Sequence, residues 1–218
     1  MKYILFDLDG TLLNTRDGIV ISVQRAIASQ GIQIDDLILL ERHIGPPLKD
    51  GFIQFYGFND EIATAAVKEF RKHYQVEGLP GTKPYDGIKD CLVGLKDMGY
   101  QLIVATSKPE LVAKKFLRHF QLDQYFLDIC GSIDEGEEKR ITKGQVLDYV
   151  IKNNQIDTMD QTIMVGDRFH DVMGAKEVQI PCIGVSYGFG SREELMNAGA
   201  IHVVDTPREL LEYIKCME

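Results

Sequence analysis

No apolar run in this 218-residue sequence approaches the ~18 residues that a helix needs to span a bilayer. Lys2 leads directly into a short strand-like run, which is not the pattern of a signal peptide. The four cysteines lie far apart, without a C-x-x-C pair or a nearby histidine cluster, so reduced and mostly buried thiols are expected rather than a zinc site. We therefore expect a cytoplasmic protein that does not bind membranes.

Basic residues are in the minority. The 24 Lys and Arg residues face 33 Asp and Glu residues, which gives a formal net charge of -9. Such a field repels nucleic acid and anionic membranes, so we expect neither as a partner, and any site for a phosphate group must be local. The 44% hydrophobic and 26% charged residues are typical of a packed globular protein.

Short apolar runs alternate with amphipathic stretches over most of the sequence. The run Tyr3–Phe6 is typical of a parallel strand that is covered on both faces. Similar runs occur at 102–105, 163–165, 182–185 and, as a short edge strand, 202–204. Helices are predicted at 88–98, 109–120, 142–153, 170–177, 192–198 and 207–216. This alternation predicts an α/β fold with a doubly wound parallel sheet.

Residues 16 to about 80 interrupt the alternation. Helical patterns occur at 19–29 and 61–74, but no run in this region is typical of a buried strand. Pro and Gly cluster in residues 78–84, as they do in linkers. We expect an α-helical insert at 15–83 and one larger domain formed by residues 1–14 and 84–218.

Asp7 and Asp9 follow the first predicted strand, at the edge where open parallel sheets bind ligands. Gly10 lets the chain turn, so both carboxylates can face one small cavity. A cation, or a proton retained on one acid, relieves their repulsion, and a retained proton suits a general acid beside a nucleophile. A turn with two solvated aspartates is the alternative that this motif alone leaves open.

Asp167 and Asp171 follow a second buried run, at 163–165. If a helix begins near Arg168, Asp171 lies in its first turn and both acids can point toward the strand end. An ordinary acidic residue at a helix N-terminus is the alternative. His170 lies close by, but hard oxygen ligation makes it a bystander or an indirect hydrogen-bond donor.

Four carboxylates at one sheet edge would repel one another strongly without a hard cation, and oxygen ligands suit Mg²⁺ better than zinc. We therefore expect Mg²⁺ as the cofactor. Asp7, Asp167 and the backbone carbonyl of Asp9 are the expected ligands, because Mg²⁺ keeps several water molecules and a substrate oxygen. Asp171 binds either directly or through water.

A third strand end offers the hydroxyl groups of Thr106 and Ser107 ahead of a predicted helix, which favours an anion. Thr106 can donate to a phosphoryl oxygen, and a simple helix N-cap by Thr106 or Ser107 is the alternative. Lys143 stands at another helix start, where a cation opposes the helix dipole and calls for a compensating anion. A solvated charge, or a role taken by Lys139 or Arg140 instead, is the alternative.

The ordered set of D-x-D-G-T at 7–11, a strand-end Thr, a later Lys and G-D-x-x-x-D at 166–171 resembles the haloacid dehalogenase superfamily of phosphohydrolases, over nearly the whole chain. The resemblance implies a Rossmann-like core with a helical cap inserted after the first motif. It also implies that Asp7 is the nucleophile and Asp9 the general acid and base. Thr106 and Lys143 are then the residues that hold the phosphoryl group, and we expect Ser107 and Gly10 to bind it as well.

Within the superfamily, the stretches at 44–48, 105–109 and 166–171 are similar to a bacterial subgroup near the phosphoglycolate phosphatases, some of them described as 5′-nucleotidases. The implied substrate is a small phosphorylated metabolite, and the implied protein is a monomer or homodimer. Arg168 stands at a position where members of this family often have a small residue with a hydroxyl group. The loop Tyr187–Gly190 lacks the context of a dinucleotide site and is predicted to be a turn near the site.

Two other functions share the motifs. A sugar phosphomutase of the same superfamily uses the same pair of acids, and a non-catalytic binding module could keep the fold; a dehalogenase is disfavoured because it needs neither Asp9 nor the acidic metal site. In the insert, Arg42, His43 and Lys49 flank Gly45-Pro46-Pro47 and could contact the leaving group. A solvated helix end is the alternative favoured for these three residues.

Overall fold

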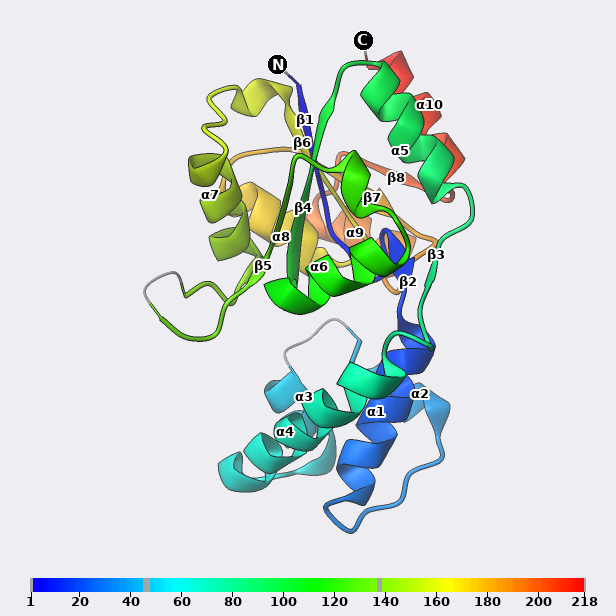
Figure 1. Cartoon of the computed structure of the whole chain (residues 1–218), viewed down its shortest axis with the longest axis vertical. Coiled ribbons are helices and arrows are strands. Elements are labelled where there is room, and N and C mark those ends of the chain that lie inside the picture. The colour runs from blue at the N-terminus through cyan, green and yellow to red at the C-terminus, as the bar shows by residue number, and fades with distance from the viewer. Residues whose placement is uncertain (1, 45–47, 137–138, 218) are drawn as a thin grey trace. The chain divides into compact units, whose positions relative to one another are not determined.

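The computed structural model of the chain describes residues 2–44, 48–136 and 139–217 (Figure 1). Contacts within the chain divide it into two compact units. The first, called the sheet unit here, consists of Met1–Asn14 and Pro84–Glu218, and the second, the helical unit, consists of Thr15–Lys83. The two connecting segments, β2 (Leu13–Asn14) and β3 (Lys83–Pro84), pair with each other as a two-stranded sheet.

The sheet unit contains a six-stranded sheet in the order β5-β4-β1-β6-β7-β8. Its strands are β1 (Tyr3–Phe6), β4 (Gln101–Pro109), β5 (Asp128–Ser132), β6 (Thr162–Gly166), β7 (Cys182–Val185) and β8 (His202–Val204). All pairings between them are parallel. The α/β fold with a parallel sheet is therefore confirmed, and β8 is an edge strand as predicted.

Helices cover both faces of this sheet, which is why the central residues of its inner strands are apolar. One face packs against α7 (Lys143–Asn153), α8 (Phe169–Glu177) and α9 (Arg192–Ala198). The other packs against α5 (Ile88–Asp97), α6 (Glu110–His119) and α10 (Pro207–Cys216), and Figure 1 shows α5 and α10 side by side. Every residue of β1, β6 and β7 is buried, as expected for strands between two helical layers.

The edge strand β5 is absent from the sequence prediction. Its residues, Asp-Ile-Cys-Gly-Ser, include few apolar side chains and show no clear alternation of apolar and polar positions. An edge strand buries less of its surface than an inner strand and so needs fewer apolar residues. Strand β4 also continues four residues beyond the predicted end at Ala105, with an irregular register between Ala105 and Pro109. Thr106, Ser107 and Lys108 therefore lie on a strand extension rather than in a loop.

The helical unit consists of α1 (Arg16–Ala28), α2 (Leu37–Glu41), α3 (Leu48–Tyr56) and α4 (Asp60–Glu77). The structure has helices where the patterns at 19–29 and 61–74 predict them, whereas α2 and α3 were not predicted. Among the described residues, no helix is both long and apolar enough to cross a membrane. Asn59 and Asp36 begin α4 and α2 by accepting backbone N–H groups with their side chains.

Candidate active site

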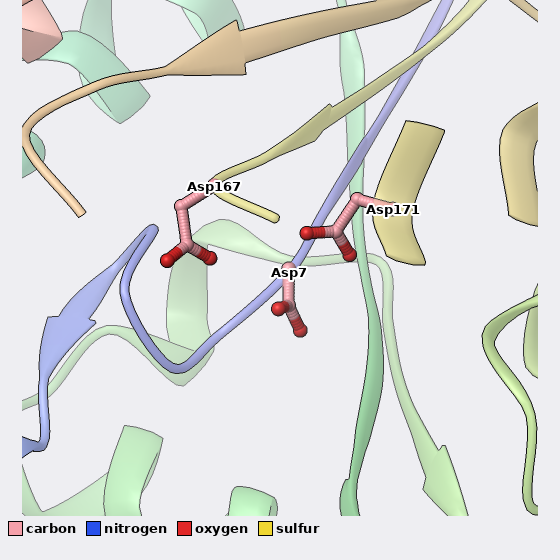
Figure 2. A group of neighbouring side chains, drawn as sticks. All are labelled: Asp7, Asp167 and Asp171. Carbon is pink, nitrogen blue, oxygen red and sulfur yellow. The ribbon is translucent and has the colours of Figure 1, made fainter. Parts of the chain in front are cut away.

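Three aspartates meet where two inner strands of the sheet unit end. Asp7 follows β1, Asp167 follows β6, and Asp171 lies in the first turn of α8. One carboxylate oxygen from each lies within 4.8 Å of the others, and Figure 2 shows the three side chains as neighbours. The strand register explains this meeting, because Phe6 pairs with Val165 and places the residues after both strands side by side.

Helix α8 orients Asp171. The Asp171 carboxylate accepts the backbone N–H of Arg168 at 3.0 Å, which begins the helix and turns the side chain back toward the end of β6. Asp167 is fully buried and Asp171 is 1% exposed. The expectation that both acids point to the strand end therefore matches their positions in the structure.

Two of these aspartates, Asp7 and Asp171, contact the positively charged side chain of Lys143. This lysine is the first residue of α7, and its Nζ lies 2.8 Å from Asp7 Oδ1 and 2.9 Å from Asp171 Oδ1 while donating to the carbonyl of Ala105 at 3.0 Å. Burial would lower the pKa of Lys143, but the charges of Asp171 and Asp7 outweigh it and raise that pKa. The cation at a helix start thus has its compensating anions.

One ammonium group does not balance three carboxylates, of which Asp167 and Asp171 are buried and Asp7 is half-buried. Burial first, and then the charges of Asp171 and Asp7, raise the pKa of Asp167 well above its usual value. For Asp171, burial raises the pKa to about 6, opposed by Lys143 and reinforced by Asp7. Among the described residues, the buried Oδ1 atoms of Asp7 and Asp171 contact Lys143 Nζ and have no further hydrogen-bond partner. An all-oxygen set with excess negative charge fits a hard divalent cation such as Mg²⁺.

The fourth carboxylate, that of Asp9, faces a different partner. Lys108 Nζ lies 3.0 Å from both Asp9 Oδ1 and Asp9 Oδ2. No role for Lys108 was predicted from the sequence. A signal was available, since Thr106 and Lys108 are two positions apart on an extended segment and so share one side of it.

Thr106, the residue predicted to bind a phosphoryl group, is buried at the end of the sheet. It is 1% exposed at the carboxyl end of the sheet, and its Oγ1 accepts the backbone N–H of Lys108 at 3.2 Å. This bond leaves the hydroxyl proton available to donate. The alternative of a helix cap is wrong, because the N-cap of α6 is Pro109 and no side chain caps that helix. Ser107, by contrast, is exposed.

The backbone at Gly10 and at Gly188 lies directly against the side chain of Asp167. Gly10 has a φ of 81°, and a Cβ there would lie 2.1 Å from Asp167 Oδ2. A Cβ on Gly188 would lie 2.4 Å from Asp167 Cβ, while the neighbouring Phe189 N–H donates to Asp167 Oδ2 at 2.8 Å. The Tyr187 hydroxyl donates to the Thr11 carbonyl at 3.1 Å. The predicted turn at Tyr187–Gly190 therefore packs directly against Asp167.

Other charged residues considered at the sequence level have different partners. Arg140 is buried and pairs with Glu110, which removes it as a substitute for Lys143, and Lys139 is exposed. Arg168 Nε donates to Glu194 at 2.9 Å, beside the acidic group but turned to α9. His170 packs against the ring of Phe169, and burial together with Arg168 lowers its pKa.

The three residues proposed for leaving-group contact differ from one another. His43 is 2% exposed among the rings of Phe52, Phe55 and Tyr56, so the solvated helix end is wrong for this residue. Arg42 is exposed, and Lys49 pairs with Asp60 at 2.7 Å. The segment Gly45-Pro46-Pro47 lies outside the described residues.

Comparison with known proteins gives a family. The family model described as haloacid dehalogenase-like hydrolase matches residues 4–185. A 5′-nucleotidase of Pseudomonas aeruginosa is 44% identical over 192 residues, covering 88% of this chain and 86% of that protein. A phosphoglycolate phosphatase of Vibrio vulnificus is 27% identical over 222 residues, covering 98% of this chain and 96% of that protein.

A solved structure extends the likeness to three dimensions. The crystal structure of a predicted phosphatase from Clostridium acetobutylicum has a TM-score of 0.91 and 45% identity, and the match covers 98% of this chain and 97% of that chain. The match includes both the sheet unit and the helical unit, and the predicted Rossmann-like fold is confirmed.

Proposed function

The chain belongs to the haloacid dehalogenase-like hydrolase family, and from this premise we propose that it hydrolyses small phosphate monoesters with Mg²⁺ through an aspartyl phosphate on Asp7. The observation that carries the proposal is the meeting of Asp7, Asp167 and Asp171, with Lys143 in contact with Asp7 and Asp171. A group with one cation and three carboxylates suits a divalent ion and a phosphoryl group better than a purely structural role.

The metal-binding residues in this proposal are Asp7, Asp167 and the backbone carbonyl of Asp9, with Asp171 directly or through water. When bound, Mg²⁺ would neutralise the carboxylates and the negative phosphoryl oxygens, so that an anionic nucleophile can approach an anionic substrate. Both Asp171 oxygens already have partners, Lys143 and the Arg168 N–H, which supports orientation of Lys143 as a further task of Asp171.

In the first step a carboxylate oxygen of Asp7 attacks phosphorus in line with the departing ester oxygen. The Asp7–phosphorus bond forms as the bond from phosphorus to the leaving oxygen breaks. Asp9 donates a proton to that oxygen, and the alcohol departs. Lys143 and the hydroxyl of Thr106 hold the equatorial phosphoryl oxygens, with backbone N–H groups near Gly10 and the hydroxyl of Ser107 as further donors.

In the second step water attacks the phosphorus of the aspartyl phosphate. Asp9 accepts a proton from this water, the bond from Asp7 to phosphorus breaks with its electron pair returning to the carboxylate, and inorganic phosphate leaves. Two accessible barriers replace one very high barrier, since uncatalysed monoester hydrolysis is among the slowest reactions that enzymes accelerate, by up to ~10²¹-fold.

The names of the relatives suggest small phosphate monoesters as the class of substrate. The relatives in Pseudomonas aeruginosa and Vibrio vulnificus are named for nucleotide and phosphoglycolate substrates, which supports testing nucleoside monophosphates and 2-phosphoglycolate first. In this proposal the helical unit at 15–83 acts as the cap that selects the leaving group, and residues 1–14 with 84–218 form the catalytic core.

The deciding experiment measures phosphate release from a panel of monoesters with and without Mg²⁺. We expect stoichiometric release of phosphate that stops when EDTA removes the metal. Release that continues in EDTA would overturn the metal dependence, and no release from any ester would overturn the phosphatase assignment. Interconversion of sugar phosphates without phosphate release would instead identify a mutase.

A further inference from the structure

Lys108 and Asp9 form a second ion pair beside the acidic group. The ammonium of Lys108 is equidistant from the two Asp9 oxygens, at 3.0 Å, and so fixes the plane and direction of that carboxylate. The Lys108 side chain is only 4% exposed, whereas that of Asp9 is 25% exposed. The cation is thus held inside the protein while one edge of the carboxylate stays open to water.

A buried lysine needs support, and the surroundings of Lys108 provide it. Its Nζ also lies 4.8 Å from the centroid of the Phe116 ring, in a cation–π contact. Its backbone N–H donates to Thr106, which ties the lysine to the proposed phosphate-binding hydroxyl. Removing an ammonium group from water is unfavourable, so a buried ion pair adds little to the stability of the fold. Stability alone therefore does not explain why this pair is buried.

The two buried lysines of the site divide the carboxylates between them. Lys143 contacts Asp7 and Asp171, whereas Lys108 contacts Asp9. The Asp9 side chain therefore contacts its own cation instead of sharing Lys143 with Asp7 and Asp171. This separation assigns the two lysines to different parts of the reaction.

We propose that Lys108 is a positioning residue that holds the Asp9 carboxylate for the second half of the reaction. The inference rests on the proposed function, since it concerns the hydrolysis of the aspartyl phosphate on Asp7. Water attacks phosphorus and gives one proton to Asp9, and the Asp7–phosphorus bond breaks with its electrons returning to Asp7. A carboxylate fixed at both oxygens and open at one edge can meet this water in a single orientation.

The test separates formation of the phosphoenzyme from its decay. With p-nitrophenyl phosphate, whose leaving group needs little help from an acid, stopped-flow absorbance follows the burst of p-nitrophenolate and the later steady state. In Lys108→Met we expect the burst to remain and the steady state to slow about 10- to 100-fold. The value of kcat should fall while kcat/KM changes little, so that KM falls with kcat.

Controls keep the interpretation specific. Lys152→Met removes an exposed pair with Asp148, and this variant should match the wild type in both phases. Lys108→Met should add nothing to Asp9→Asn, because both act on the same base. Lys108→Gln keeps a polar head and serves as a second variant should the methionine variant fail to fold.

Three results would overturn the inference: burst and steady state that fall together, decay at the wild-type rate, or a further slowing in the Asp9→Asn background. A wild-type protein that releases no p-nitrophenolate in Mg²⁺ would instead overturn the proposed function, and the role of Lys108 with it. Normal wild-type turnover with unaltered decay in the Lys108 variants would remove only the role of Lys108.

Discussion

Buried ionisable groups have different surroundings in the two units of the chain. In the sheet unit, Lys143 contacts Asp7 and Asp171, and Lys108 contacts Asp9. In the helical unit, the buried His43 lies among aromatic rings, and within the described residues neither of its ring nitrogens has a hydrogen-bond partner. Charge therefore organises the interior of the site, whereas aromatic packing organises the interior of the insert.

This difference indicates where each unit is vulnerable. Removing one charge from the sheet unit changes the reacting groups and leaves the surrounding strands in place. Adding one charge to the helical unit, by protonating His43, places an uncompensated cation among rings. The first change should affect catalysis more than folding, and the second should affect folding more than catalysis.

The largest effect should come from Asp7→Asn. The amide is a poor nucleophile, so turnover should fall by roughly 10³-fold or more. Stability should not fall, because one of three mutually repelling carboxylates is lost. Steady-state kinetics and urea unfolding measure the two effects.

A matched control for this variant lies in the helical unit. Asp36→Asn makes the same chemical change at the N-cap of α2, where asparagine caps equally well, and should leave both activity and stability close to wild type. Wild-type activity in Asp7→Asn would contradict covalent catalysis. A large loss of activity in Asp36→Asn would show that the helical unit contributes chemistry.

The second effect concerns Mg²⁺ and the stability of the sheet unit. At about 100 times its Kd, an ion that binds only the folded state raises the free energy of unfolding by ~2.7 kcal/mol. Urea unfolding with and without Mg²⁺ measures this rise, and Asp167→Asn should remove most of it. Hydrogen exchange should show added protection in β1 and β6 and not in α4. Equal stabilisation of the Asp167→Asn variant would place the ion elsewhere.

The sequence predicted the sheet unit better than the insert for a physical reason. Inner strands are buried on both faces, so their apolar runs are recognisable, and the polar residues that follow Phe6 and Gly166 stand out against them. The strand β5 has only one neighbouring strand and a mixed composition, and it was missed for that reason.

The sequence predicted which residues belong to the candidate site, but not which of their side chains contact one another. Motif positions brought Asp7 and Asp167 into one hypothesis, the family resemblance added Lys143, and the structure places the three residues together. The partner of Asp9 could not be derived, because the extension of β4 that carries Lys108 depends on a long-range strand pairing with β5. His43 was assigned to solvent because one histidine close to the sequence Pro46-Pro47 gives no periodic signal of burial.

The third effect is acid destabilisation of the helical unit through His43. Burial lowers the pKa of His43 to about 4, against about 6.5 in an unfolded chain. Because the folded-state pKa is the lower one, the stabilising contribution is complete above pH 6.5 and is lost as the pH falls from 6.5 toward 4. The loss should reach about 2 kcal/mol at pH 5.

Urea unfolding at pH 7 and pH 5 tests this loss. His43→Leu, which cannot take up a proton, should show a smaller difference between the two pH values by about 2 kcal/mol. His202→Gln changes an exposed histidine of the sheet unit and should keep the wild-type difference. Equal acid sensitivity in His43→Leu would show that other groups cause the loss.

The smallest predicted effect comes from removing one helix N-cap in each unit. Asn59 begins α4 by accepting the N–H of Ile62 at 2.9 Å, and Thr142 begins α7 by accepting the N–H of Gln145 at 3.2 Å. Replacing either with Ala should lower the free energy of unfolding by about 1 kcal/mol. Only Thr142→Ala should also lower kcat, because Lys143 is the next residue and its position depends on that first turn. Equal loss of kcat in Asn59→Ala would show that α4 controls the reaction as closely as the sheet unit does.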